Sequence, residues 1–282
     1  MNRALFILSC LALLAGCRKQ SAPESSGIPE RIVSLAPNIT ETIYALELGD
    51  RLVGATTFCT YPEAAKNIPR VGGFGQFNFE AIVSLKPDLV ILHTEYASEK
   101  HRLQNLGIPY LETESFFMAD ILKSIRNIGD ACGTVQEADA LIADINKRTP
   151  GNHKTGNAPR VLITFGSQTE GVDQIQAFGT ECLHNELLEL AGGKNVIENK
   201  LAFSVLSKEA VIRLNPDIII QLAPGSEPLD NPTAAWKELS GVAAVRNNRI
   251  HVLTGDYTCI PGPRFIRILE DFEQLIASAD QP

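Results

Sequence analysis

The chain has 282 residues, a formal net charge of −8 and 44% hydrophobic residues. This length allows one sizeable core or two small domains. The acidic balance and the lack of any run of basic residues exclude nucleic acid as an expected partner. Past residue 16, no apolar stretch is long enough to span a bilayer.

The N-terminus has the pattern of an export signal. Arg3 precedes an apolar stretch, residues 4–14, that is too short to cross a membrane. The letters LAGC, ending at Cys17, resemble a bacterial lipobox, in which the cysteine is lipidated. We therefore expect a signal peptide over 1–16, a lipid-anchored flexible tether over 17–28, and a periplasmic or cell-surface location. An ordinary signal peptide that happens to contain a cysteine is the alternative.

Strands and helices alternate through the first half of the chain. Strands are predicted at 31–35, 52–56, 89–92 and 110–113, with helices at 42–48, 80–85 and 99–106. Such alternation is typical of a parallel sheet covered by helices on both faces. The pattern predicts an N-terminal α/β lobe over residues 29–116.

The next segment, residues 117–149, has apolar positions at helical spacing and no proline. Gly129 and Gly133 lower the helix propensity in the middle of this segment. We predict one long α-helix, straight or bent, that joins two lobes. A rigid helix of this kind permits only a small rocking of one lobe against the other.

A second lobe is predicted over residues 150–282. It begins with a turn-rich linker, and its strands are expected at 160–165, before Phe178, at 218–221 and at 249–253. Helices are expected at 181–190 and 231–239, and after Arg264. The fold class is therefore α/β, with two Rossmann-like lobes and a ligand cleft between them.

One segment occurs twice. Residues 79–92 and 208–221 share six of fourteen positions at a constant offset of 129 residues. That period is too long for a solenoid repeat and fits two lobes built on one plan. Each copy carries a glutamate, Glu80 or Glu209, in the first turn of its helix, where an acid also suits the helix dipole. The duplication points to two matched contact sites, one on each lobe.

Aromatic residues recur in the loops expected at the carboxyl ends of the strands. They are Phe58, Tyr61, Phe74, Phe77, Phe178, Phe203 and Tyr257. Ligands of open parallel sheets bind at that edge. The aromatic residues predict an apolar cleft for a large, flat or bulky ligand. Packing at the rims of the lobes is the alternative interpretation.

Four cysteines follow Cys17, and their spacing allows three full pairings. Cys132 is expected inside a helix, as a small buried hydrophobic residue. Cys182 and Cys259 both fall in the second half beside element ends, so we predict a possible disulfide between them. Cys59, Cys182 and Cys259 all border the expected cleft, where a thiolate metal site is less favoured than packing or a disulfide.

No catalytic motif is present. The sequence lacks a G-x-S-x-G elbow, a P-loop and an HExxH motif. His93 at a strand end and His184 on a helix are better explained as satisfied or solvated side chains than as ligands. We therefore predict no catalytic residues, no bound metal and no enzymatic activity. An exported enzyme or metal-site lipoprotein that uses His93 and the cysteines remains a remote alternative.

Several long segments together resemble a known family. They are RIVSLAPNITETIYALELGDRLVGAT, FCTYPEA, VGGFGQFNFEAIVSLKPDLVI, GTECLHNELLELAGGKNV and SKEAVIRLNPDIII. Over about residues 30–277 the chain is similar to the class III periplasmic binding proteins, which serve ABC importers of vitamin B12, iron-siderophores and haem. It looks closest to the vitamin B12-binding branch. The resemblance implies two lobes that close little on binding, and a protein that is monomeric when free. It also implies a small-molecule ligand and a permease dimer with its ATPase subunits as partners, without a cofactor other than the transported corrinoid.

The resemblance also assigns roles to residues. The family's docking glutamates fall on Glu80 and Glu209, and each is expected to face an arginine pocket on the permease dimer. The ligand-binding residues implied or predicted are Phe58, Tyr61, Phe74, Phe178, Phe203, Asp256 and Tyr257. Ile260 stands where a B12-binding relative has a ligand-contacting arginine. Siderophore binders grip anionic chelates with cations, for which Arg70 and Arg264 are the nearby candidates, so a siderophore or haem remains the alternative ligand.

Overall fold

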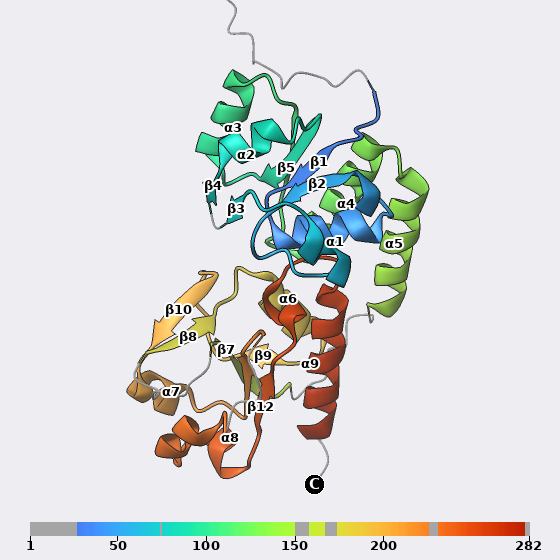
Figure 1. The fold of residues 1–282 in the computed structure, drawn as a ribbon. Helices are drawn as coiled ribbons and strands as arrows, with labels where there is room; N and C mark the ends of the chain where they lie inside the picture. Colours follow the sequence, from blue (N-terminus) through green and yellow to red (C-terminus); the bar gives the residue numbers. More distant parts are fainter. Residues whose placement is uncertain (1–26, 74, 150–157, 167–173, 226–230, 280–282) are drawn as a thin grey trace, which may run out of the picture.

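The computed structural model describes residues 27–73, 75–149, 158–166, 174–225 and 231–279. The expected signal peptide, Cys17, most of the tether and Phe74 lie outside these residues. The described chain forms two lobes, one above the other in Figure 1. Among the described helices, none has the length and apolar character needed to cross a membrane.

The first lobe contains a four-stranded parallel sheet in the order β2-β1-β5-β6. Its strands are β1 (Ile32–Ser34), β2 (Leu52–Ala55), β5 (Leu89–His93) and β6 (Tyr110–Thr113), and its helices are α1 (Pro37–Ala45), α2 (Phe79–Ser84) and α3 (Ala97–Asn105). A two-stranded ribbon, β3 (Gly72–Gly73) with β4 (Gln76–Phe77), lies outside this sheet. Because successive strand residues point to opposite faces, Ile32 joins one core while Val33 joins another.

The second lobe contains a mixed sheet. Its strands run in the order β10-β8-β7-β11-β12, with β9 also paired to β7. They are β7 (Arg160–Phe165), β8 (Ile175–Phe178), β9 (Lys194–Asn195), β10 (Phe203–Leu206), β11 (Ile218–Leu222) and β12 (Ile250–Leu253). The helices are α6 (Leu183–Leu190), α7 (Lys208–Leu214), α8 (Ala243–Arg246) and α9 (Phe265–Ala279). The expected α/β class with two lobes and parallel-type sheets is confirmed, with one addition: β8 pairs antiparallel with both β7 and β10, whereas the other pairs of this sheet are parallel.

The sequence repeat is also a structural repeat. In the first lobe, the Asp88 carboxylate accepts a hydrogen bond of 2.9 Å from the backbone N–H of Arg31. In the second lobe, Asp217 accepts a bond of the same length from Arg160 N–H. Both pairs are related by the same offset of 129 residues, and each fixes the start of the lobe's first strand. The duplication therefore includes the start of each lobe's first strand, 57 residues before the aspartate of the repeat.

The segment 117–149 is two helices and not the single long helix expected. α4 (Met118–Cys132) ends at Gly133, whose φ of 74° is left-handed, and α5 (Val135–Arg148) begins directly after it. Glycine adopts this conformation without the steric cost that other residues carry, and it commonly ends helices. α5 packs back on α4 so closely that a Cβ added at Gly129 would lie 2.6 Å from the Cβ of Ala138. The apolar periodicity of the two helices runs in register, which is why it resembles one helix in the sequence.

One hydrophobic core extends through both lobes. It includes Ile39 of α1, Ile125 of α4, and Phe265 and Phe272 of α9, all at most 1% exposed. Figure 1 shows α1 above the start of α9 at the junction of the lobes. Sliding one lobe far over the other would expose this apolar surface to water, which is unfavourable. The shared core therefore restricts the motion of one lobe against the other, a role that the sequence predicted for a single connecting helix.

Candidate functional site

An arginine of the second lobe binds a glutamate of the first. Arg264 precedes α9, and its Nε and Nη2 donate to the Glu41 carboxylate on α1, at 2.9 and 2.6 Å. Its Nη1 and Nη2 also donate to Asp256, at 2.8 and 3.2 Å. The ring of Tyr61, from the first lobe, lies 3.7 Å from the guanidinium carbon. We call Arg264, Glu41, Asp256 and Tyr61 the interlobe cluster.

The two carboxylates of this cluster are in different environments. The Glu41 side chain is only 3% exposed, and burial raises its pKa although the hydrogen bonds and charge of Arg264 oppose this. Asp256 is 44% exposed, and its hydrogen bonds from Arg264 lower its pKa. A guanidinium has five N–H donors, and here it faces two carboxylates through four short contacts. Arg264 is therefore occupied within the protein, and its charge is already matched.

Two predicted ligand-binding aromatics form a pair in the second lobe. The rings of Phe178 and Phe203 are 5.0 Å apart. Phe178 is 3% exposed, whereas Phe203 is 60% exposed, so only Phe203 has a large free surface. Phe203 lies on β10, at the edge of the sheet, and not in a loop as expected.

His184 connects this pair to the interlobe cluster. Its ring centre is 4.1 Å from that of Phe178, and its Nε2 donates to the backbone carbonyl of Thr258 at 2.7 Å. Thr258 belongs to the short 3-10 helix Asp256–Cys259, which carries Asp256. Burial lowers the pKa of His184 to about 4, so the imidazole is neutral at physiological pH. His184 positions neighbouring groups, and its side chain is not available to a ligand.

The loop after β2 presents two more aromatics. Phe58 and Tyr61 are 45% and 39% exposed. Arg70 holds this loop through three backbone carbonyls, those of Thr56, Cys59 and Lys66, at 2.8, 3.0 and 3.0 Å. Arg70 therefore has a structural role in shaping the loop, to which it donates three hydrogen bonds through Nη1 and Nη2.

Tyr257 stands beside the cluster with its hydroxyl already bonded. Its ring centre lies 6.0 Å from the guanidinium carbon of Arg264, and its hydroxyl donates to Asp271 at 2.6 Å. Burial, with help from the Asp271 carboxylate, raises the pKa of Tyr257 to about 12. The structure thus gathers Tyr61, Asp256 and Tyr257 around Arg264.

Two exposed phenylalanines at the same junction were missed by sequence reasoning. Phe116 and Phe117 are 53% and 36% exposed and follow β6 directly before α4. The next residue, Met118, donates its backbone N–H to Glu186 of α6 in the second lobe, at 2.7 Å. Two adjacent phenylalanines just after a strand were the available signal. Their position beside an interlobe hydrogen bond adds them to the candidate ligand-contacting surface.

The predicted disulfide between Cys182 and Cys259 is not formed. Cys59, Cys132, Cys182 and Cys259 are all free thiols. The Cys182 sulfur faces the backbone carbonyl of Gly179 at 3.4 Å, and the Cys259 sulfur faces the Thr258 hydroxyl at 3.9 Å. Each sulfur is thus turned to its own local partner. Spacing along the chain could not reveal these side-chain directions.

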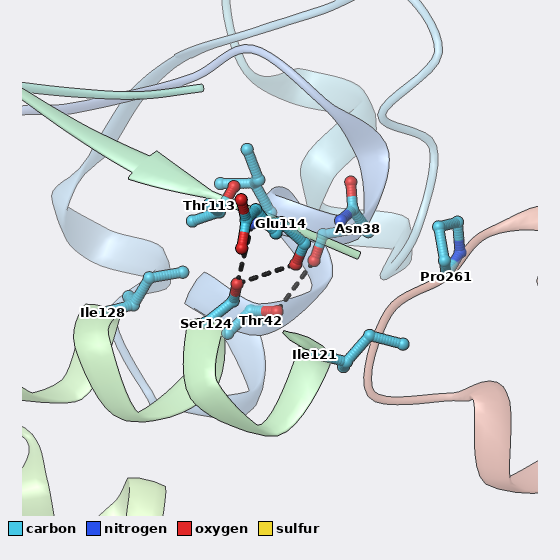
Figure 2. Close-up of a pocket in the computed structure, with 9 residues that line it drawn as sticks. Asn38, Thr42, Thr113, Glu114, Ile121, Ser124, Ile128 and Pro261 are labelled. Carbon is cyan, nitrogen blue, oxygen red and sulfur yellow. Dashed lines mark hydrogen bonds between the residues drawn. The ribbon is translucent and has the colours of Figure 1, made fainter. Parts of the chain in front are cut away.

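His93, the other candidate histidine, is also held inside. Its Nε2 lies 3.0 Å from the amide oxygen of Asn38, and burial lowers its pKa. Close by is a cavity of about 10 Å³, which has room for about one water molecule. It is lined by Asn38, Ile39, Thr42, Thr113, Glu114, Ile121, Ser124, Ile128 and Pro261, as Figure 2 shows. It is too small for the expected ligand, and in the described parts of the chain no three His, Cys, Asp or Glu side chains are placed to bind a metal.

The two glutamates of the repeat occupy equivalent positions. Glu80 lies in the first turn of α2, where the Asn78 side chain accepts from the helix at 3.0 Å. Glu209 lies in the first turn of α7, where Ser207 accepts in the same way at 3.3 Å. Both glutamates are exposed. In the view of Figure 1 the two helices are on the left, one in each lobe.

The sequence model of the family described as periplasmic binding protein matches residues 32–257. The chain belongs to the periplasmic binding protein family. It is 32% identical over 258 residues to YvrC, an uncharacterised ABC transporter substrate-binding lipoprotein of Bacillus subtilis, covering 88% of this chain and 80% of that one. A vitamin B12-binding protein of Pectobacterium atrosepticum is 27% identical over 250 residues, covering 85% of each chain. The periplasmic heme-binding protein RhuT of Roseiflexus has a TM-score of 0.75 and 28% identity, covering 90% of this chain and 100% of that one.

These similarities confirm the resemblance seen in the sequence. The chain is a periplasmic binding protein of the ABC transporter type. Such proteins bind small ligands, work with permease and ATPase components, and are transport proteins rather than enzymes. The family and the lipoprotein relative also support an exported location for this periplasmic binding protein.

Proposed function

We propose that this protein is a lipid-anchored carrier of cobalamin or a related corrinoid, which it delivers to its permease. The observation that carries the proposal is the set of exposed aromatics on both lobes, Phe58 and Tyr61 on the first and Phe203 on the second. Tyr61 lies on Arg264 of the second lobe, and Phe203 packs on Phe178 beside His184. A corrinoid has a broad flat ring system edged with uncharged amides. Aromatic side chains bury large areas against such a ligand and need few polar partners.

The state of the two nearby cations favours a ligand of low charge. Arg264 is matched by Glu41 and Asp256, and Arg70 is occupied by backbone carbonyls. An anionic iron chelate would have to displace Glu41 or Asp256 before it could use Arg264, while Nη1 and Nη2 of Arg70 are turned to the backbone of their own loop. A corrinoid edged with uncharged amides can bind without a free guanidinium, which supports a corrinoid over a siderophore.

Haem is the second candidate, favoured by the similarity to RhuT. Tyr61 lies directly on Arg264, and a phenol oxygen with a neighbouring guanidinium suits iron and a propionate, respectively. Haem binding would then require Arg264 to leave Asp256, its more exposed partner.

Absorbance titration separates the candidates. Purified protein lacking residues 1–17 is mixed with excess cyanocobalamin or hemin and passed through gel filtration. The proposal expects the red chromophore to co-elute with the protein in about equal amounts. A colourless protein peak at saturating cyanocobalamin would remove the corrinoid, and a shifted haem absorbance band would establish the second candidate.

The anchor is tested separately in cells of the source bacterium. The full chain should be found with the membrane and incorporate a fatty-acid label, while Cys17→Ser should lose both properties. Ligand binding by the purified protein should not change. A label that persists in Cys17→Ser would show that the lipobox assignment is wrong.

A further inference from the structure

Each repeat copy exposes an apolar side chain beside its glutamate. Val83 is 44% exposed and Ile212 is 51% exposed, and they are related by the same offset of 129 residues as Glu80 and Glu209. Each lies three residues after its glutamate. Residues at this spacing are neighbours on one helix face.

Val83 and Ile212 are not needed to fill the hydrophobic core beneath their helices. The inward side of each helix is already provided by Ile82 and Val211, both fully buried. A surface helix normally carries polar residues on the opposite side. The next exposed position follows that rule and differs between the copies, with Ser84 in one and Arg213 in the other. Both copies thus keep a β-branched apolar residue at the Val83/Ile212 position, although the next surface position, Ser84/Arg213, differs between them.

We infer that the permease contact on each lobe has two parts, the glutamate and the exposed β-branched side chain one turn later. This inference rests on the proposed delivery of the ligand to a permease and on the docking role that the family resemblance implies for Glu80 and Glu209. The occupant is a partner with two equivalent surfaces, because the two patches are copies of one another. Each partner surface presents a cation next to an apolar side chain, since an acid and an aliphatic group lie together on each patch.

The two parts have different effects on binding. The glutamate attracts and orients the partner, and its contribution weakens as salt concentration rises. The aliphatic side chain contributes by burial, which salt does not screen. Loss of the apolar pair should therefore weaken docking to a similar degree at low and high salt.

The test measures binding of the protein, with and without cyanocobalamin, to its cognate permease–ATPase complex in nanodiscs. The double variant Val83→Asn, Ile212→Asn should weaken this binding about 100-fold, or about tenfold at each site, at both salt concentrations. Leu106→Asn is the matched control, because Leu106 is 47% exposed at the end of α3 and outside both patches. Thermal unfolding and affinity for the ligand identified by titration should be unchanged in all variants.

The outcomes separate this inference from the docking proposal. Glu80→Gln with Glu209→Gln should also weaken binding, mainly at low salt. If the glutamine pair weakens binding and the asparagine pair does not, the apolar part is wrong while docking through the glutamates stands. If neither pair weakens binding, both proposals fail. An equal loss in Leu106→Asn would overturn the apolar part, because the effect would not be specific to the repeat.

Discussion

Arg264 and Glu41, which are 223 residues apart in the chain, form a two-point hydrogen-bonded ion pair across the junction of the lobes. The Glu41 side chain is 3% exposed and that of Arg264 is 10% exposed. A buried carboxylate is stable in its charged form only when it is paired. This pair therefore joins the two lobes at the same place as the shared hydrophobic core.

Replacing Arg264 by glutamine should destabilise the protein strongly. The change leaves Glu41 buried without its cation, for which we expect a loss of about 3–5 kcal/mol in the free energy of unfolding. Urea unfolding followed by circular dichroism measures it. Arg267→Gln, on the exposed side of α9, is the control and should change stability little. Glu41→Gln should restore part of the loss when combined with Arg264→Gln, and purely additive effects would contradict a direct coupling.

Stability should fall in acid because of His184. Its pKa is about 4 in the folded protein, below its ordinary value of 6.5, so the unfolded chain takes up a proton first as pH falls. The stabilisation is fully present above pH 6.5 and is lost as pH falls toward 4, by about 3 kcal/mol.

Unfolding free energies of the wild type and His184→Gln between pH 7 and pH 4 isolate this effect. His93 and His251 also have lowered pKa values, so part of the acid sensitivity should remain in the variant. His101→Gln, on the surface of α3, controls for the loss of an imidazole. Equal slopes in His184→Gln and the wild type would contradict the buried, neutral state of His184.

The sequence was informative where the signal is local. Periodicity located most strands and helices, since it depends on residues close together in the chain. The repeat located Glu80 and Glu209, since two similar segments can be recognised at any separation. The break at Gly133 was also local, but the apolar pattern continues past it and favoured one helix. Only the left-handed conformation of Gly133 shows that the chain reverses there.

The interlobe contacts could not be predicted in this way. Glu41 is an acid in a helix, and nothing within its neighbouring residues distinguishes it from a surface residue. Its burial follows from the approach of Arg264, and a single sequence contains no record of which distant residues meet. The same limit explains the wrong disulfide, because Cys182 and Cys259 have suitable positions but turn to local partners.

The four thiols should be countable. In denaturant, protein lacking residues 1–17 should react with four equivalents of Ellman's reagent, because Cys59, Cys132, Cys182 and Cys259 are free. In the native state the reaction should be slow at pH 8, since burial raises the pKa of Cys132 and Cys259 to about 11. Protein purified from an oxidising compartment that yields only two equivalents would show that a bridge forms there after all.

The ligand-binding role of Phe203 can be tested with little risk to the fold. Its ring is 60% exposed on an edge strand, so Phe203→Ala should change the free energy of unfolding by less than about 1 kcal/mol. Loss of its stacking surface should weaken cyanocobalamin binding about tenfold, measured by equilibrium dialysis. Leu106→Ala removes an exposed apolar side chain outside the site and should leave the affinity unchanged. Full affinity in Phe203→Ala would mean that the ligand does not contact β10, and the site would then have to lie on the first lobe's aromatics, Phe58 and Phe116.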